Sequence, residues 1–480
     1  MSMPLKEKLA SLLVNAARTG NLDLRRATNL EADVRRLKSI RDKQKRLTAA
    51  RSLTHKYPDH PQAHLALAES LHLLNDPSEF SQYRRYGQVL EQWLNKTGLG
   101  ALGMEFIWPG IVMGSLGNYY ALEALLQANR LGLRPSRKPM LLLPEGAQVR
   151  NTSLFSYFEP HLTVIRDREA IRALRDLEAL MTLPLGYCLP MDGGCSFLDF
   201  PTNRVEVALT EQQGDKAFFS LTDEHRQRGA MTLREWGMPS DAWYVTIHVR
   251  EPGYRGERGH SQDWRNANPL DYLDAIRLVV KEGGWVVRMG DPSMTPLPEM
   301  PQVIDYAHHP DRSDWMDVYL WATGRFLIGT ASGPLAMPRL FGCPAIFTNS
   351  ANSVPYYGLR SEDLYLPRLL RNRLDGSYLS FGQMLRPPTS MFSSPERFSQ
   401  AGLEWVENTA DELAAATQEM LRRTAGEGNA SIREDETQNR FKLIAEACGK
   451  EYGGQSVKAF ATVSREFVNR HADLLSTNEH

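Results

Sequence analysis

Apolar residues recur at helical spacing in the first hundred positions and then give way to short apolar runs of strand length. Leu5, Leu9, Leu12, Leu13 and Ala16 form an i, i+4, i+7, i+8 stripe, and a stretch with further helical spacing follows. After about residue 400 helical spacing returns. The pattern predicts a helical segment over 1–100, alternating strands and helices over 101–235 and 236–400, and a helical tail over 401–480.

The first strand–helix unit starts near residue 101. Residues 106–113 form an apolar run, residues 114–118 a glycine-containing turn, and residues 119–133 a helical pattern. Strand, turn and helix in this order open a βαβ unit. Strand candidates at 140–143 and 162–165 continue it. The turn supplies four candidate ligand-contacting residues, Gly114, Ser115, Gly117 and Asn118.

The second unit alternates more regularly. Apolar strands are expected at 243–249, 285–289, 303–306, 325–328 and 345–348, with helices between them, including one over 335–341. This alternation predicts a doubly wound parallel sheet, in which ligands bind at the carboxyl ends of the strands. Polar residues and glycines gather at those ends, and the candidates are His248, Arg250, Arg288, Gly290, Asp291, Asp305, Thr330, Ser332 and Gly333.

These candidates share one chemistry. Arg250 and Arg288 each offer a guanidinium fork that can hold phosphate oxygens in pairs. Thr330 and Ser332 add hydroxyls, and a helix starting at Pro334 would add backbone N–H groups. We therefore expect this edge of the sheet to hold a diphosphate.

Composition excludes some classes. The chain has 480 residues, with 56 Lys plus Arg against 57 Asp plus Glu, a formal net charge of −1. A protein that coats nucleic acid is normally basic, so no nucleic-acid partner is expected. Four cysteines without CxxC spacing argue against a disulfide scaffold. Neither a spanning apolar stretch nor a signal peptide is visible, so we expect a cytoplasmic protein with at most peripheral membrane contact.

The N-terminal helices suggest a docking role. Residues 56–94 contain one helical hairpin with small residues in its first helix, which resembles a tetratricopeptide unit. One or two such units would cap a neighbouring domain or bind a protein partner. His60 and His64 are four residues apart, as zinc ligands can be, but no third ligand accompanies them, so no metal is expected.

Two motifs resemble glycosyltransferases. The run Thr246-Ile247-His248-Val249-Arg250 resembles the H-x-R motif of fucosyltransferase-like enzymes. Residues 325–334 with 341–344 resemble the nucleotide-sugar site of heptosyltransferase-like enzymes, and residues 243–349 resemble a bacterial family of GT-B glycosyltransferases. The resemblance implies two Rossmann-like domains facing a cleft. It assigns the acceptor to 101–235, with the turn at 114–118 on the acceptor side, and the donor to 236–400.

The implied reaction moves a sugar from a nucleotide sugar, GDP- or ADP-linked, to a glycan, lipid or protein. The sequence has no Asp-x-Asp, the pair that usually holds a divalent ion on the diphosphate, so we expect metal-independent catalysis by positive groups without a cofactor. Arg265 and Asn266 lie on a polar loop (residues 254–268) expected to close over the donor. Glu251 and then Asp291 are the candidate bases. Asp291 equally suits a turn-capping role before Pro292.

Two other classes remain open from the residues. One is a non-catalytic α/β binding module whose helical hairpin is the working part. The other is an epimerase or phosphatase-like enzyme that acts on a nucleotide sugar without an acceptor. Binding of one nucleoside diphosphate would favour a glycosyltransferase over the non-catalytic module. Turnover without an acceptor would favour the epimerase or phosphatase-like enzyme.

Overall fold

The computed structural model describes residues 24–74, 76, 78–183, 188–191, 194–197, 199–212, 217–253, 263–350, 360–392, 394–426, 436–453 and 461–476. Contacts divide the chain into two compact units. Unit 1 comprises Met1–Arg150 and Phe155–Val205, and unit 2 comprises Asn151–Leu154 and Glu206–His480. The predicted stripe at 5–16 and residues 254–262 of the predicted closing loop lie outside the described residues.

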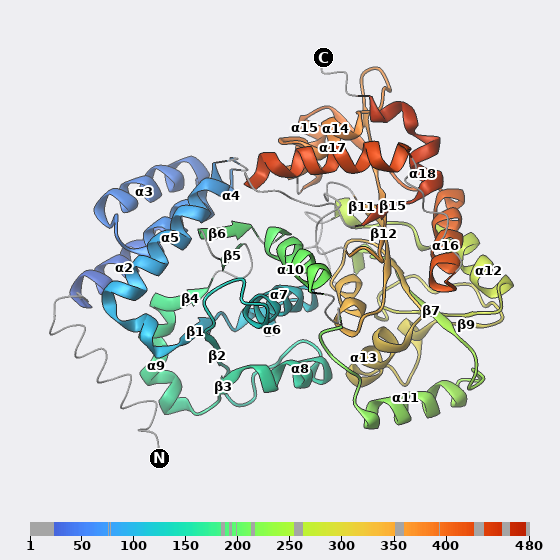
Figure 1. The fold of residues 1–480 in the computed structure, drawn as a ribbon, viewed down its shortest axis with the longest axis horizontal. Helices are drawn as coiled ribbons and strands as arrows, with labels where there is room; N and C mark the ends of the chain where they lie inside the picture. Colours follow the sequence, from blue (N-terminus) through green and yellow to red (C-terminus); the bar gives the residue numbers. More distant parts are fainter. Residues whose placement is uncertain are drawn as a thin grey trace. The chain divides into compact units, whose positions relative to one another are not determined.

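The described part of unit 1 begins with four helices, the first three of which pack around a small apolar core containing Leu30, Ala50 and Ala63. The helices are α2 (Leu24–Ser39), α3 (Lys43–Lys56), α4 (Pro61–His72) and α5 (Glu79–Thr97), and α4 and α5 form the predicted hairpin (Figure 1). Its likeness to a tetratricopeptide unit stays a prediction.

The histidine pair of the hairpin has local structural roles. The His60 side chain accepts a hydrogen bond from the Gln62 N–H at the start of α4, and His64 Nε2 lies 2.8 Å from the Pro58 carbonyl oxygen. Each imidazole is therefore used to fix the turn before the helix or its first turn.

A four-stranded parallel sheet follows, in the order β3-β2-β1-β4. Its elements are β1 (Met104–Ile107), α6 (Gly110–Met113), α7 (Tyr119–Arg130), β2 (Lys138–Leu142), α8 (Thr152–Phe158), β3 (Thr163–Ile165), α9 (Arg168–Met181) and β4 (Thr182–Leu183). The strand predicted over 106–113 ends at Ile107. Pro109 lacks an N–H for a strand ladder, and its φ of −57° suits the start of a helix.

The described part of residues 183–212 forms three further elements. They are the antiparallel hairpin of β5 (Cys188–Met191) and β6 (Gly194–Phe197), and then α10 (Asp199–Glu211). The Asp-Gly-Gly sequence at 192–194 is typical of a hairpin turn, and this signal could have revealed the pair. Helix α11 (Asp223–Glu235) comes next, and the Thr222 side chain caps its first turn.

Unit 2 contains a seven-stranded sheet in the order β15-β12-β11-β10-β7-β8-β9, with every neighbouring pair parallel. The first strand of the unit, β7, lies inside the sheet, and later strands add on both sides of it. Chain order therefore reverses between β7 and β10, which is the switch point of a doubly wound sheet. The strands are β7 (Tyr244–His248), β8 (Trp285–Arg288), β9 (Val303–Ile304), β10 (Leu327–Gly329), β11 (Ala345–Ser350), β12 (Leu364–Pro367) and β15 (Thr462–Val463).

Helices α12 (Leu273–Lys281) and α16 (Ala410–Thr424) lie side by side and share one apolar core with the sheet (Figure 1). That core includes Val245 and Ile328 from the strands and Ile276 and Met420 from the helices. The remaining elements of unit 2 are α13 (Asp314–Thr323), β13 (Leu369–Asn372), α14 (Phe381–Leu385), α15 (Pro395–Gln400), β14 (Leu403–Val406), α17 (Glu436–Gly453) and α18 (Arg465–Arg470).

The segment predicted as a helical tail, 401–480, is built into unit 2. Its residues 462–463 pair with β12 as an edge strand, and α16 covers the sheet. A strand of two residues is too short to give an alternating pattern in sequence.

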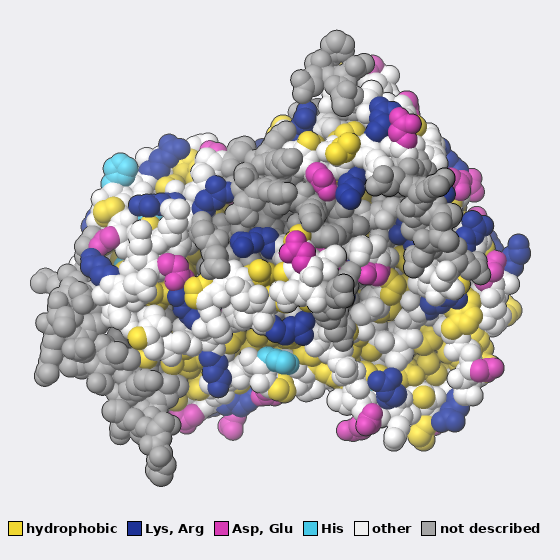
Figure 2. All heavy atoms as spheres, in the orientation of Figure 1, with side chains coloured by type: hydrophobic (Ala, Val, Ile, Leu, Met, Phe, Trp, Pro, Cys, Tyr) yellow, Lys and Arg dark blue, Asp and Glu magenta, His cyan; other side chains and the backbone are white. Residues whose placement is uncertain are grey.

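Charged residues are interspersed on the surface. On the face drawn in Figure 2, Lys and Arg side chains alternate with Asp and Glu side chains among the described residues. No helix in the described part of the chain combines the length and the hydropathy needed to cross a bilayer.

Candidate functional site

The carboxyl ends of β7 and β10 meet at the switch point of the unit 2 sheet and bring four predicted residues together. The Arg250 N–H donates to Thr330 Oγ1 over 2.9 Å, and the Thr330 N–H donates to the His248 carbonyl oxygen over 3.2 Å. Ser332 Oγ lies 3.0 Å from His248 Nδ1. Arg250 and Ser332 are half-buried, so their side chains reach the boundary between the sheet and solvent.

Gly329 allows this close approach of the two strand ends. A β-carbon at this position would lie 3.0 Å from the His248 carbonyl oxygen and 2.9 Å from a methyl group of Leu327. A side chain here would require the His248 carbonyl group and the Leu327 side chain to shift, and glycine avoids this.

His248 is neutral in the folded protein. Burial lowers its pKa to about 4, and the positive charge of Arg288 acts in the same direction. A neutral imidazole leaves Nδ1 and the Ser332 hydroxyl as an uncharged hydrogen-bonded pair. His248 therefore positions Ser332 rather than supplying positive charge.

This depressed pKa predicts a pH effect on stability. Between pH 6.5 and about 4 the unfolded chain binds a proton at His248 that the folded chain does not bind. Its contribution is fully present above pH 6.5 and is lost as the pH falls, by up to about 3 kcal/mol at the acid end. We expect His248→Asn to lose less unfolding free energy than the wild type between pH 7 and 4.5 in urea titrations.

The wild type and His248→Asn must be compared with each other, because other buried groups change the unfolding free energy with pH in the opposite direction. Burial raises the pKa of Asp317 to about 7 and that of Asp363 to about 6, so these carboxyls favour folding as the pH falls. Both groups are present in wild type and variant and cancel in the difference. If the unfolding free energies of the wild type and His248→Asn changed equally with pH, His248 would not be held neutral in the folded protein.

Arg250 also contacts the segment that was expected to close over a ligand. Its Nη1 donates to Asn266 Oδ1, and its carbonyl oxygen accepts from the Ala267 N–H over 3.1 Å. Arg265 is half-buried in the same segment. The structure thus places Arg265 and Asn266 beside the strand end that carries Arg250.

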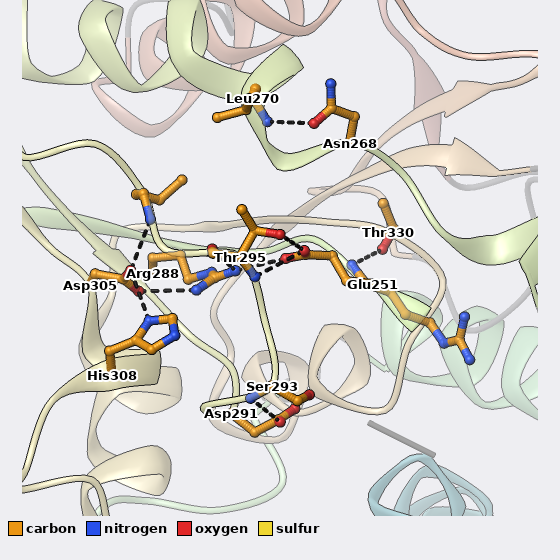
Figure 3. Close-up of polar contacts among 12 residues, drawn as sticks. Glu251, Asn268, Leu270, Arg288, Asp291, Ser293, Thr295, Asp305, His308 and Thr330 are labelled. Atoms are coloured by element: carbon orange, nitrogen blue, oxygen red, sulfur yellow. Dashed lines mark hydrogen bonds and ion pairs between the residues drawn. The ribbon is translucent and has the colours of Figure 1, made fainter. Parts of the chain in front are cut away.

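Arg288 lies in a buried layer instead of on a ligand surface. Only 2% of it is exposed, and Figure 3 shows its guanidinium between Asp305 on one side and Glu251 on the other. Nη1 donates to Asp305 Oδ1 over 3.0 Å, and Nη2 donates to Glu251 Oε1 over 2.9 Å and to the Thr295 carbonyl oxygen over 3.1 Å. The sequence predicted that both Arg250 and Arg288 bind the diphosphate. This prediction is wrong for Arg288, and Arg250 is the remaining candidate.

The same contacts remove Glu251 as the base. It is buried, and while Oε1 accepts from Arg288, Oε2 accepts from the Thr295 N–H over 3.0 Å and from Thr295 Oγ1 over 2.5 Å (Figure 3). A buried carboxylate that is paired with Arg288 and accepts three hydrogen bonds from protein groups has a structural role, not that of a base open to an acceptor hydroxyl.

Asp305 is likewise engaged within the chain. Besides Arg288, it accepts hydrogen bonds from the Leu297 N–H and from His308 Nδ1, each at 3.0 Å. It holds the segment after β8 against the end of β9, so the structure gives this residue a supporting role and not the predicted ligand contact.

The turn after β8 explains two further candidates. Asp291 Oδ1 accepts from the Ser293 N–H over 3.0 Å, which is the turn-capping role that the sequence left open (Figure 3). Gly290 has a φ of +155°, and a β-carbon there would lie 2.2 Å from Met294 Sδ. The glycine is required by the backbone, whereas the half-buried Asp291 carboxylate can still meet a second partner.

The helix predicted over 335–341 is replaced by two short 3₁₀ turns, η7 (Pro334–Ala336) and η8 (Pro338–Phe341). Pro338 has no N–H for a helical hydrogen bond, and the chain forms two separate turns on either side of Met337. The helix N-terminus expected beside Gly333 is therefore the start of a three-residue 3₁₀ turn. The hydroxyls of Thr330 and Ser332 are the polar groups that β10 contributes.

The turn after β1 in unit 1 holds the other predicted set. Asn118 Nδ2 donates to the Gly110 carbonyl oxygen over 3.1 Å, and a β-carbon on Gly114 would lie 2.7 Å from that oxygen. Gly114 and Asn118 thus close the turn between α6 and α7. Ser115 and Gly117 lie in the same turn, at the carboxyl end of β1.

Sequence reasoning missed Arg368, which follows β12 and is fully buried. Its guanidinium donates to the Trp264 carbonyl oxygen over 2.5 Å and to the Asn266 carbonyl oxygen, and Nε donates to Asn349 Oδ1 over 3.3 Å. It ties the segment beside Arg250 to the sheet. The apolar run at 364–366 followed by an arginine was the signal of another strand end.

Both units thus define an α/β protein with two parallel sheets, each with its first strand inside the sheet. No protein-family model and no curated protein matches the sequence.

Solved structures with partial likeness include E. coli ADP-heptose LPS heptosyltransferase II (12% identity, 55% of this chain, 89% of that chain, TM-score 0.33). Others are E. coli heptosyltransferase WaaC with ADP (11%, 67% and 98%, 0.32) and a family 9 glycosyl transferase from Veillonella parvula (13%, 52% and 67%, 0.26). TM-scores this low establish neither a fold family nor an activity for this chain.

Proposed function

We propose that the protein is a metal-independent glycosyltransferase of the GT-B type, which transfers a sugar from a nucleotide sugar to a glycan, lipid or protein acceptor. One observation carries this proposal. At the switch point of the unit 2 sheet, the backbone N–H of the half-buried Arg250 donates to the Thr330 hydroxyl, and the Ser332 hydroxyl lies 3.0 Å from Nδ1 of His248, two residues before Arg250. Ligands of doubly wound sheets bind at such a point, and a guanidinium with hydroxyls suits a diphosphate.

In the proposed reaction, the acceptor oxygen forms a bond to the anomeric carbon of the sugar. The bond from that carbon to the diphosphate oxygen breaks, and the nucleoside diphosphate leaves with the electron pair. Arg250 stabilises the negative charge that develops on the leaving group, and Ser332 donates a hydrogen bond to it. Asp291, the carboxylate with room for a second partner, takes the acceptor proton.

The surrounding residues position this group. Arg265 and Asn266 lie in the segment beside Arg250, where they can cover the diphosphate. Arg288, Glu251 and Asp305 form the buried ion-pair layer on the neighbouring strand ends and hold the backbone of residue 251 in place. Charge on the diphosphate is then met by side chains, which agrees with the absence of an Asp-x-Asp pair from the sequence.

A nucleotide panel tests the proposed function. We expect one of GDP, ADP, UDP and CDP to raise the melting temperature by several degrees at millimolar concentration, because a ligand at 100 times its Kd adds about 2.7 kcal/mol to stability. GDP and ADP are the first candidates. The matching nucleotide sugar should show no turnover until an acceptor is added. If all four leave the melting curve unchanged, the non-catalytic binding module is the better description. Turnover without acceptor would indicate the epimerase or phosphatase-like alternative.

A further inference from the structure

An exposed tryptophan lies at the carboxyl end of β1, an inner strand of the unit 1 sheet. Trp108 directly follows β1 and is 55% exposed. Strand β1 pairs with β2 on one side and with β4 on the other, so chain order reverses at this strand. This is the ligand-binding position of a doubly wound sheet, and none of the chemistry proposed for unit 2 uses it.

The indole is held flat by a glycine. A β-carbon on Gly110 would lie 2.2 Å from Cη2 and Cζ2 of Trp108 and 2.5 Å from Cε2. The six-membered ring therefore lies directly on the Gly110 backbone, while the residue as a whole remains more than half exposed. One ring face is supported and the other is presented to solvent, and only glycine at 110 permits this.

Two further groups flank the same four-residue helix, α6. Met113, at its end, is 38% exposed. The backbone N–H of the exposed Arg150 donates to the Val112 carbonyl oxygen over 2.8 Å, and Arg150 Nε donates to the Gly114 carbonyl oxygen over 3.2 Å. An open aromatic face with a guanidinium nearby is thus fixed at the end of β1.

We infer that Trp108 is a stacking platform for a sugar ring, so that the acceptor is recognised as a carbohydrate; this inference rests on the proposed function. The electron-rich face of an indole attracts the weakly positive C–H groups of a pyranose face, and a guanidinium donates hydrogen bonds to the sugar oxygens. A peptide adding to the sheet needs an unpaired strand edge, and β1 has none. A lipid chain needs an enclosed apolar groove, whereas Trp108 presents a single face at the start of α6 and the charged Arg150 is bonded to the end of this helix.

The test uses the full-length protein on a microarray of immobilised neutral and acidic oligosaccharides, followed by titration calorimetry with the best binder. We expect Trp108→Ala to weaken saccharide binding at least about tenfold, a change of 1.4 kcal/mol in binding free energy. Gly110→Ala should do the same although it keeps the tryptophan, because the added methyl displaces the ring. Trp108→Phe should retain most of the binding. Leu374→Ala removes a side chain that is 94% exposed in unit 2 and is the matched control without effect.

Nucleoside diphosphate binding, measured on the same samples, separates this inference from the proposed function. All four variants should bind the nucleotide as the wild type does. The stacking role would be overturned if Trp108→Ala bound saccharides as tightly as the wild type. It would also be overturned if the protein bound the nucleotide but no saccharide. Binding of phosphatidylglycerol vesicles that depends on Trp108, without saccharide binding, would overturn it in favour of a membrane contact. Trp108-dependent saccharide binding without nucleotide binding would instead remove the proposed function and keep the subsite.

Discussion

Arg250→Ala is expected to weaken nucleoside diphosphate binding by about 30-fold or more while the melting temperature changes little. Charge-assisted hydrogen bonds contribute about 1.5–3 kcal/mol each, and a guanidinium can make two with one diphosphate. The half-buried side chain contacts Asn266 but fills no apolar core. Calorimetry with the nucleotide selected by the panel gives the affinity, and a thermal scan gives the stability.

Arg250→Lys and Arg277→Ala are the matched controls. Lysine keeps the charge but loses the fork, so it should restore binding only in part. Arg277 is an exposed arginine of α12 that pairs with Asp274, and its removal should leave nucleotide binding unchanged. If Arg250→Ala unfolds the protein, or binds nucleotide as tightly as the wild type, the guanidinium does not hold the diphosphate.

Arg288→Met has the opposite expected profile, a large loss of stability. The substitution leaves Glu251 and Asp305 without the positive charge that both contact in a buried layer. Breaking such a pair costs about 3–5 kcal/mol, because an uncompensated buried charge remains. Urea titration should show this loss, and Arg277→Met should change stability by less than about 0.5 kcal/mol.

The two arginines can then be compared at a temperature where every variant is folded. There, Arg288→Met should bind the nucleotide within a few-fold of the wild type, since its guanidinium reaches only protein groups. A stable Arg288→Met protein that cannot bind nucleotide would restore the direct ligand contact that the sequence suggested and would contradict the buried role.

The strands of unit 2 could be predicted from the sequence because their pattern depends on residues that are neighbours in the chain. Apolar runs of four to seven residues, separated by helical spacing and glycine turns, predicted β7, β8, β10 and β11 within two residues of their ends. The strands end where charged or hydroxyl residues begin, and parallel strands share one carboxyl edge. That rule alone placed His248, Arg250, Thr330 and Ser332 together.

What the sequence could not decide is which polar residue at that edge faces a ligand and which faces the chain itself. Arg250 and Arg288 end neighbouring strands and look equivalent in sequence. They differ because Asp305, 17 residues beyond Arg288, and Glu251 happen to fold beside Arg288. Contacts of this kind depend on strand order and side-chain direction, which no local pattern carries.

The sequence by itself determined two parallel α/β units and a polar edge rich in guanidinium and hydroxyl groups, because periodicity and turn residues act over a few neighbouring positions. Only the tertiary structure decided that the edge strand β15 comes from the far end of the chain, that Pro338 leaves two short turns in place of a helix, and that Arg288 is buried in an ion pair. The reason is physical: burial and charge pairing are set by residues that are distant in sequence and meet only when the sheet assembles.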